Sequence, residues 1–337
     1  MRNSSKYDKI ERKKRINSMR NENKISIIIP ASNAEESIVR CISSIYNNNY
    51  TYIECIVVVN NSSDNTMIIC EKLKKQYSNL LVIKASAKGV SEARNIGLSY
   101  ASGSLIGFCD ADDYYEPYAI DTIIDKFEKF SLDIVITELY RTKIENNQIK
   151  KSNPSVIFHD EIITVKQARG LVLNHREVMG SVCNKFYKKE IITGIMFDEE
   201  LTHCEDTYYN MQILKNNNLR IMLADLISYN YVINHSSATR AIDRCYNKEG
   251  KLKYLIAIEQ IKHDYAGNNH VQKEASYKIA ELSIDNYSRR LSRERKIILK
   301  KYIKSNCLFL FYGLSRYGFK RNVKRIMKCI LIILHII

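Results

Sequence analysis

The feature of this chain that most constrains its fold is an alternation of short apolar runs with helical patterns between residues 25 and 110. The first run, residues 25–30, is continuous, rich in β-branched side chains and stopped by Pro30, as in a strand buried on both faces of a sheet. Strands that alternate with helices in this way predict a parallel sheet with crossover helices. Apolar residues at helical spacing follow the first run at Ile38, Cys41, Ile42 and Ile45.

The same alternation predicts the elements that follow. Further strands are expected at residues 54–59, 80–83, 105–109 and 132–138, and helices at 66–77, 91–103 and 116–130. The pattern loosens between residues 143 and 184, a helix begins at Glu205, and helical periodicity dominates residues 251–305. We therefore expect an α/β fold followed by a helical C-terminal region.

Polar side chains follow three of the predicted strands at the point where each strand ends. Ser32 and Asn33 follow the first strand, residues 60–64 follow the second, and the sequence DADD at residues 110–113 follows the fourth. In open parallel sheets the ligand crevice lies beyond the carboxyl ends of the strands. The sequence therefore predicts a binding site at this edge of the sheet.

Asp110 and Asp112 bring two carboxylates to one short turn. Such hard oxygen ligands suit Mg²⁺ or Mn²⁺, which keep open coordination positions that a diphosphate can fill. The alternative is that these acidic residues only cap the helix expected from Glu116. Their position beside two other polar loops favours the cation site.

The net charge of +15 resides at the two ends of the chain. Residues 1–24 hold nine basic and three acidic side chains, and residues 289–337 hold fourteen basic side chains and one acidic. The remainder therefore has a net charge of −4 and shows no strongly basic face of the kind that binds a nucleic-acid duplex. We expect no nucleic acid among the partners.

The C-terminal segment, residues 311–337, combines basic side chains with an apolar run too short to span a bilayer. A basic helix of this kind suits an anionic membrane surface. The alternative is that it docks on its own domain or on a second copy of the chain.

No secretory signal opens the chain, and its nine scattered cysteines contain no C-x-x-C pair. We expect reduced thiols in a cytoplasmic protein, peripheral to the inner face of the cell membrane.

Four motifs, taken together, carry a family resemblance. They are IIPASNAE at residues 28–35, NSSDNT at 61–66, GVSEARNIG at 89–97 and DADDYYEP at 110–117. In this order and with these spacings they resemble glycosyltransferase family two over about residues 24–240. The resemblance implies a GT-A fold, which is a Rossmann-like, mostly parallel sheet with flanking helices. We expect this catalytic domain at residues 24–240, a basic tail at 1–23, a helical region at 241–310 and the membrane-surface helix at 311–337.

The resemblance also implies the chemistry and the residues that perform it. A divalent cation, Mn²⁺ or Mg²⁺, would assist an inverting transfer from a nucleotide-sugar donor, with a UDP-sugar favoured. Asp112 would hold the cation on the diphosphate, with Asp110 contacting the ribose or the metal. His235 would complete the cation's shell or be an ordinary loop residue. The nucleotide-sugar-binding set carried over by position is Pro30, Ala31, Ser32, Glu35, Asn60, Arg94, Asp110 and Ala111.

An inverting transfer also needs a base that removes the proton of the acceptor hydroxyl. The family has it in a Glu-Asp pair after a Phe-containing stretch, and residues 197–201 followed by Glu205-Asp206 match that pattern. The resemblance thus indicates Asp206 as the base, with Glu205 as the alternative and a charged helix cap as the other interpretation. The implied acceptor is a glycan hydroxyl, on a lipid-linked glycan, in bacterial cell-surface polysaccharide synthesis. An oligomer is compatible with the sequence.

The chain departs from the family pattern after the second strand. Where the family usually shows Asp-Asp-Gly, this chain has Val59-Asn60-Asn61, so the carboxylate expected to accept from the ring N–H of the base is an amide. An asparagine both donates and accepts hydrogen bonds. Ser32 also replaces a common aromatic residue that would stack on the base. We expect altered base selectivity, with uracil still compatible.

Two other functions share some of these features. A nucleotidyltransferase that forms a sugar nucleotide would have a parallel sheet and metal-binding aspartates. It should also have a glycine-rich phosphate loop after the first strand, and residues 31–34 contain no glycine. A non-catalytic, basic membrane-surface-binding protein would explain the loss of the Asp pair, but the presence of Asp112 and Asp206 argues against it.

Overall fold

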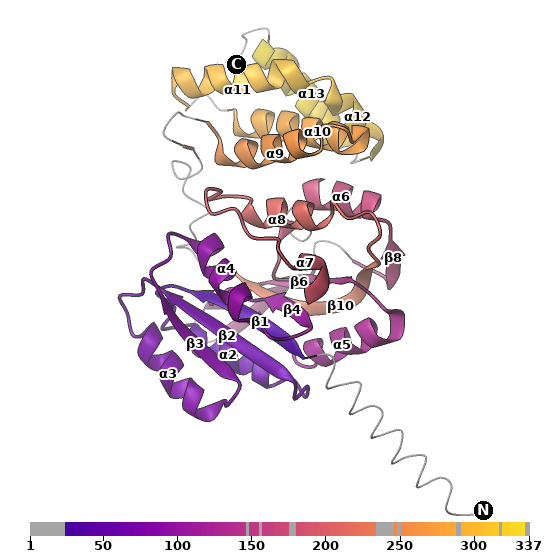
Figure 1. The fold of residues 1–337 in the computed structure, drawn as a ribbon. Coiled ribbons are helices and arrows are strands. Elements are labelled where there is room, and N and C mark those ends of the chain that lie inside the picture. Colours follow the sequence, from indigo (N-terminus) through magenta and orange to yellow (C-terminus); the bar gives the residue numbers. More distant parts are fainter. Residues whose placement is uncertain are drawn as a thin grey trace, which may run out of the picture. The chain divides into compact units, whose positions relative to one another are not determined.

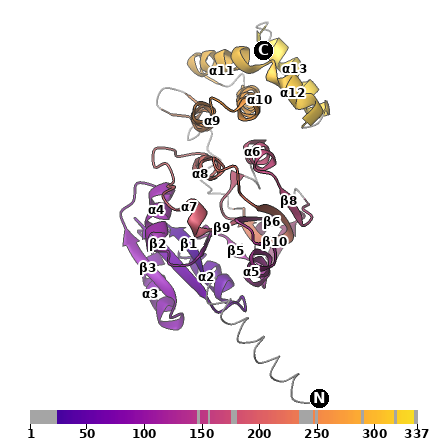
Figure 2. The same ribbon diagram turned by 45° about the vertical axis from the view of Figure 1, so that its right-hand side comes forward.

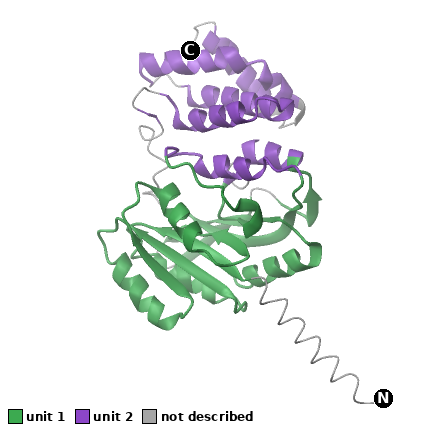
Figure 3. Cartoon of the chain, in the orientation of Figure 1, with its two compact units in different colours: residues 1–165, 181–199, 218–234 green, residues 166–180, 200–217, 235–337 purple. Residues whose placement is uncertain are grey.

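The computed structural model describes residues 24–145, 148–154, 157–174, 180–233, 246–247, 251–287, 291–316 and 319–333. The chain divides into two compact units (Figure 3). Unit 1 takes in residues 1–165, 181–199 and 218–234, and unit 2 takes in residues 166–180, 200–217 and 235–337.

Unit 1 is built on one mixed sheet, whose main path runs β3-β2-β1-β4-β9-β6-β10-β5, with β7 added on β6 and β8 on β10 (Figure 1). Strands β1 to β4 are mutually parallel, and β6 is parallel to β10, whereas β9 is antiparallel to both of its neighbours. The strands are β1 (Ile25–Ala31), β2 (Ile53–Asn60), β3 (Leu80–Ala85), β4 (Leu105–Phe108), β5 (Tyr114–Tyr115), β6 (Ile134–Glu145), β7 (Gln148–Ser152), β8 (Glu161–Ile163), β9 (Lys185–Lys188) and β10 (Ile221–Val232).

Helices cover both faces of the parallel part of this sheet. In Figure 2 the strands β1 to β3 lie between α4 (Val90–Tyr100) on one side and α2 (Ile38–Tyr46) and α3 (Thr66–Gln76) on the other. The buried residues of α2 are the four apolar positions that its sequence spacing predicts. Gly97 lets α4 approach β1 closely, because a Cβ atom there would lie 2.4 Å from Ile28 Cγ2. Helices α5 (Ala119–Phe130) and α7 (Lys189–Ile192) complete the unit.

The expected α/β sheet is confirmed, but its second half was only partly foreseen. The strands β9 and β10, together with the short β5, were not predicted. The side chains of β7 are all exposed, so this hairpin strand leaves no apolar alternation in the sequence. The segment that looked unpatterned, residues 143–184, therefore contains β7, β8 and the whole of one helix, residues 165–174.

Unit 2 is helical. Its helices are α6 (Val165–Asn174), α8 (Glu205–Ile213), α9 (Lys253–Asp264), α10 (Asn269–Asn286), α11 (Arg293–Asn306), α12 (Phe309–Arg316) and α13 (Phe319–Ile333). Arg169 on α6 is 6% exposed and donates from Nε to the carbonyl of Leu214 at 2.9 Å, which joins α6 to the end of α8. No helix in the described part of the chain is long and apolar enough to cross a membrane.

One face of α13 packs inside unit 2. Arg325 is 6% exposed and lies 2.8 Å from Glu281 and 3.0 Å from Asp285, both on α10. Lys328 donates to the carbonyl of Ile284 at 2.6 Å. Two of the basic side chains of residues 311–337 are therefore used to dock the helix. Its other face exposes Lys324, Met327, Ile330 and Leu331.

Candidate active site

The loops that follow β1 and β2 are bonded to each other at one edge of the sheet. Asn33 has φ +48° and donates its N–H to Ser62 Oγ at 3.0 Å. Its side-chain oxygen accepts from the N–H of Ser63 at 2.9 Å. The register pairs Ala31 with Val59, so the two strands end together and their loops meet. This contact agrees with the site expected at the carboxyl ends of the strands.

Glu35 adds a second bond between the same loops. Its carboxylate accepts from the N–H and the side-chain amide of Asn65, at 3.0 and 2.9 Å, and its own N–H donates to Asp64 at 3.0 Å. Pro30 is half-buried and Ala31 is buried, whereas Ser32 is exposed. In this structure the carboxylate of Glu35 bonds the two loops together, whereas the exposed side chain of Ser32 is open to a ligand.

The turn after β2 explains one of the departures from the family pattern. Asn61 has φ +47°, a left-handed conformation that favours glycine and that asparagine tolerates better than most residues. Its amide donates to the carbonyl of Ala87 at 2.9 Å. Asn61, at the position where the family pattern has glycine, therefore adopts a conformation that glycine favours. The neighbouring Asn60 has a buried side-chain oxygen without a hydrogen-bond partner among the described residues.

Arg94 joins the third and fourth motifs. It is 3% exposed on α4, and its Nη2 lies 3.0 Å from Oδ1 of Asp110, whose side chain is 36% exposed. The guanidinium also lies over the ring of Phe197, 5.3 Å from its centroid. A buried guanidinium between a carboxylate and an aromatic ring has a fixed position. The structure thus brings the third and fourth motifs together through this ion pair.

Asn95, next to Arg94, holds a segment that is distant in sequence. Its side chain accepts from the N–H of Phe197 at 2.8 Å, and it donates to the carbonyl of Phe197 and to Glu199 at 3.0 Å each. These three hydrogen bonds hold residues 197–199, which precede Glu205-Asp206 in the sequence, against α4. Both segments were noted in the sequence, but the contact between them was not predicted.

The Asp110–Asp112 turn is held by hydrogen bonds from three directions. Tyr229 Oη accepts from the N–H of Asp110 at 3.0 Å and donates to Asp113 at 2.8 Å. Arg40 on α2 donates to the carbonyl of Asp112 at 2.7 Å. The N–H of Asp113 closes the turn on the carbonyl of Asp110 at 3.0 Å. Ala111, between the two aspartates, is 7% exposed.

Asp113 is the buried member of the acidic cluster. It is 1% exposed, and its other carboxylate oxygen accepts from the N–H of Val232 at 2.7 Å. Burial raises the pKa of Asp113 well above its usual range, and the neighbouring Asp112 and Asp110 raise it further. Asp113 is therefore a structural carboxyl group that ties the turn to the end of β10, and it is not available to a solvent cation.

The donor set on this turn fits a cation held partly by its substrate. No group of three or more His, Cys, Asp and Glu residues that could hold a metal occurs in the described part of the chain. Mg²⁺ commonly binds through one or two carboxylates, with substrate phosphates and water filling its other positions. Asp110 and Asp112, in a turn fixed by Tyr229 and Arg40, match that arrangement. His235 lies outside the described residues.

The two candidate bases belong to unit 2. Glu205 and Asp206 form the first turn of α8, after Cys204 with φ +61°, and both are half-buried. Asn210 donates from its amide to the backbone carbonyl of Asp206 at 2.9 Å. A helix N-terminus favours the anionic form of a carboxylate, so the helix-cap and general-base interpretations share this geometry.

The sequence did not identify Arg40 and Tyr229 as the residues that hydrogen-bond to the Asp110–Asp112 turn. Arg40 precedes Cys41 on α2 and is not one of the apolar positions of this helix, so helical periodicity gives no reason to place it at the site. Tyr229 belongs to β10, which was not predicted as a strand. A long-range hydrogen bond leaves no local signal, so neither contact could be found before the fold was known.

Comparison with known proteins identifies the family. The family model described as "Glycosyl transferase family 2" matches residues 26–195, half of the chain. The chain belongs to glycosyl transferase family 2. The resemblance found in the four motifs is thereby confirmed.

Curated relatives in this family are distant. "Uncharacterized glycosyltransferase EpsJ" of Bacillus subtilis (strain 168) is 26% identical over 260 residues, which cover 76% of this chain and 69% of the relative. "Minor teichoic acid biosynthesis protein GgaB" of the same organism is 27% identical over 253 residues, which cover 74% of this chain. The chain spans only 27% of the length of GgaB and 28% of that of "Glycosyltransferase GlyA" of Streptococcus pneumoniae.

A solved structure shows the fold over nearly the whole chain. The crystal structure of S. aureus TarS 1-349 in complex with UDP-GlcNAc superposes with a TM-score of 0.69 at 19% identity, covering 93% of this chain and 91% of that one. At this identity the similarity concerns the fold alone. The expected GT-A fold with C-terminal helices is confirmed.

Proposed function

We propose that this family 2 glycosyltransferase uses a divalent cation to transfer a sugar, with inversion, from a nucleotide-sugar donor to a glycan hydroxyl. The observation that carries the proposal is the Asp110–Asp112 turn, which is fixed at the sheet edge beside the buried Arg94. UDP-sugars are the first donors to test, because a TarS structure contains UDP-GlcNAc. Bacterial cell-surface polysaccharide synthesis is the proposed setting, because GgaB is named for teichoic acid biosynthesis.

The residues of unit 1 would bind and orient the donor. The cation, Mn²⁺ or Mg²⁺, would supply positive charge for the departing diphosphate, held by Asp112 with Asp110. Arg94 would keep the Asp110 carboxylate in place through their ion pair. Asn60 would offer its unpartnered side-chain oxygen to a ring N–H of the base.

A carboxylate at the start of α8 would be the group that accepts the proton. We assign this role to Asp206, with Glu205 as the alternative, because both are carboxylates in the first turn of α8. Removal of the proton from the acceptor hydroxyl makes it a stronger nucleophile for attack at the anomeric carbon.

Three charge-neutralising variants test this function. Asp112→Ala and Asp206→Asn should each lower sugar transfer at least 100-fold, while Asp125→Asn, an exposed carboxylate on α5, should leave it unchanged. Purified protein would be mixed with a panel of nucleotide sugars plus Mn²⁺ or Mg²⁺, and donor hydrolysis and thermal stability would be measured, since a bound donor raises stability. Full activity of the Asp112 variant would refute the proposed cation site.

We also propose that the chain works in the cytoplasm, at the inner face of the membrane, on a lipid-linked acceptor. The support is the outer face of α13, where Lys324, Met327, Ile330 and Leu331 are exposed. Such a helix can lie in the headgroup region of an anionic bilayer. Replacing Met327 and Ile330 by Gln should move the protein to the soluble fraction of cells, and an unchanged distribution would refute this part.

A further inference from the structure

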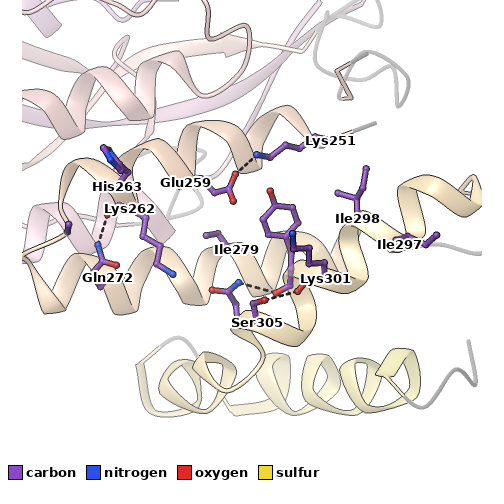
Figure 4. Close-up of a pocket in the computed structure, with 13 residues that line it drawn as sticks. Lys251, Glu259, Lys262, His263, Gln272, Ile279, Ile297, Ile298, Lys301 and Ser305 are labelled. Atoms are coloured by element: carbon purple, nitrogen blue, oxygen red, sulfur yellow. Dashed lines mark hydrogen bonds and ion pairs between the residues drawn. The ribbon is translucent and has the colours of Figure 1, made fainter. Parts of the chain in front are cut away.

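Unit 2 contains a cavity that the proposed transfer reaction does not use. It has a volume of about 760 Å³ and is lined by residues of α9, α10 and α11, together with Lys251 just before α9 and Ala266 just after it (Figure 4). This volume is within the range of small-molecule sites in proteins. All of its lining residues belong to unit 2, so it is distinct from the Asp110–Asp112 turn.

The apolar part of the lining is mainly aliphatic, with one aromatic ring, that of Tyr302. Ile279 on α10 and Ile297 and Ile298 on α11 contribute aliphatic side chains, and Ile297 is 61% exposed. An exposed isoleucine in a concave site leaves apolar surface that a hydrocarbon chain can cover, with a gain of about 0.8 kcal/mol per CH₂ group buried.

The polar part of the lining carries an excess of positive charge. Lys251 is paired with Glu259 and lies 5.7 Å from the ring centroid of Tyr302. Burial lowers the pKa of Lys251, but its hydrogen bonds to Glu259 and Tyr302 outweigh this and leave the pKa raised. The charge of Lys251 is thus already balanced by Glu259.

Two further lysines have no such partner. Neither Lys262 nor Lys301 has an ion-pair partner within the part of the chain that the structure describes, and both line the cavity. Figure 4 shows their side chains on either side of Ile279. Gln272 cannot substitute for them, since its amide donates to the backbone carbonyls of Lys262 and Tyr265.

We propose that this cavity binds an amphiphile that has a phosphate monoester head group and a hydrocarbon chain. The head group would lie between Lys262 and Lys301, and the chain would cover Ile297 and Ile298. A phosphate monoester carries between one and two negative charges at neutral pH and so matches two lysines, whereas a carboxylate matches one. A mainly aliphatic lining, whose one aromatic ring already lies beside Lys251, favours hydrocarbon over a nucleotide base.

Dodecyl phosphate, used below its critical micelle concentration, is the probe for this site. Calorimetric titration of the full chain should show saturable binding that is at least tenfold tighter than that of inorganic phosphate or dodecyl maltoside. If dodecyl maltoside bound as tightly as dodecyl phosphate, the phosphate charge would not contribute to binding. If inorganic phosphate bound as tightly, the hydrocarbon chain would not contribute. Either result would overturn the proposal.

Two double variants with the same charge change locate the site. Lys262→Gln/Lys301→Gln should weaken binding of dodecyl phosphate at least tenfold. Lys273→Gln/Lys304→Gln changes exposed lysines of α10 and α11 that do not line the cavity, and should bind within twofold of the unmodified protein. Equal losses in the two variants would show a general charge effect and overturn the proposal. Lys273, Lys301 and Lys304 are exposed and Lys262 is half-buried, and thermal unfolding confirms that each variant is folded.

Vesicles identify the source of the ligand. If the phosphate belongs to a bilayer lipid, sedimentation with vesicles containing phosphatidic acid should fall in the cavity variant and not in its control. If only soluble dodecyl phosphate shows the difference, the ligand is a free phosphoester; both results support the cavity as the site. No donor sugar or turnover enters these measurements, so their outcome is independent of the transfer reaction.

Discussion

The hydroxyl of Tyr229 lies 2.8 Å from a carboxylate oxygen of Asp113, although 116 residues separate the two in sequence. The same hydroxyl accepts the N–H of Asp110 at 3.0 Å, so one oxygen atom of β10 links both ends of the acidic turn. Because Asp113 is buried and the turn itself is short, this bond determines where the carboxylates of Asp110 and Asp112 can lie.

Removal of this hydroxyl should weaken cation use. In Tyr229→Phe we expect a loss of about 1–3 kcal/mol in the free energy of unfolding, because Asp113 and the Asp110 N–H lose a buried partner. The Mn²⁺ concentration for half-maximal activity should rise severalfold. Tyr115→Phe is the matched control, since that buried hydroxyl donates only to the carbonyl of Phe108, at 2.8 Å, and should affect stability alone. An equal effect of both variants on the cation titration would contradict a positioning role for Tyr229.

Arg94 cannot be exchanged for lysine without loss. Arg94→Lys keeps the charge but loses the planar contact with Phe197 and the geometry of the bond to Asp110. We expect a tenfold or larger increase in the donor KM and a stability loss of about 1–2 kcal/mol, a modest figure because Asp110 is partly exposed. Arg220→Lys, at an exposed position, serves as the control in steady-state kinetics and urea unfolding. An unchanged KM would separate Arg94 from donor binding.

Asn60 should influence the choice of base. Its unpartnered oxygen can accept a ring N–H, while its amide can also donate, so it should discriminate among bases less strictly than a carboxylate does. Asn60→Asp should therefore change the ratios of UDP, CDP and dTDP affinities, measured by competition binding. Asn61→Gly, which suits the same turn at φ +47°, should leave those ratios unchanged. Unaltered ratios in the Asn60 variant would refute the hypothesis.

Glu54 lies at the edge of the sheet where β1 and β2 begin. Its carboxylate should make the stability of unit 1 depend on pH. Burial would raise the pKa of Glu54, but hydrogen bonds from Lys24, from Ser102 and from Ser26 outweigh it and lower the pKa to about 2. Since the folded-state pKa is below the unfolded value of 4.5, this stabilisation is complete above about pH 4.5 and is lost as the pH falls towards 2.

Glu54→Gln measures that contribution. The difference in the free energy of unfolding from the unmodified protein should be about 1–2 kcal/mol near pH 7, after allowance for solvent screening of the partly exposed Lys24. It should shrink between pH 4.5 and 2 in urea titrations, with donor binding at pH 7 unaffected. A difference that stays constant over this pH range would exclude the ionised carboxylate as its cause.

The local pattern of the sequence was sufficient for the first half of the fold. Hydrophobic periodicity reports the burial of each side chain relative to its neighbours, which is why the four inward residues of α2 and the strands β1 to β4 could be predicted. The meeting of the loops after β1 and β2 also followed, because parallel strands end at a common edge.

Tertiary structure alone decided the contacts that hold the site. The bonds from Arg40 to the carbonyl of Asp112, from Tyr229 to Asp113 and from Asn95 to Phe197 each join segments that no periodic pattern relates. The cavity between Lys262 and Lys301 likewise appears only when α9 and α11 come together on α10. The physical reason is that a sequence pattern encodes which face of an element is apolar, whereas the partner of a polar side chain depends on the path of the whole backbone between them.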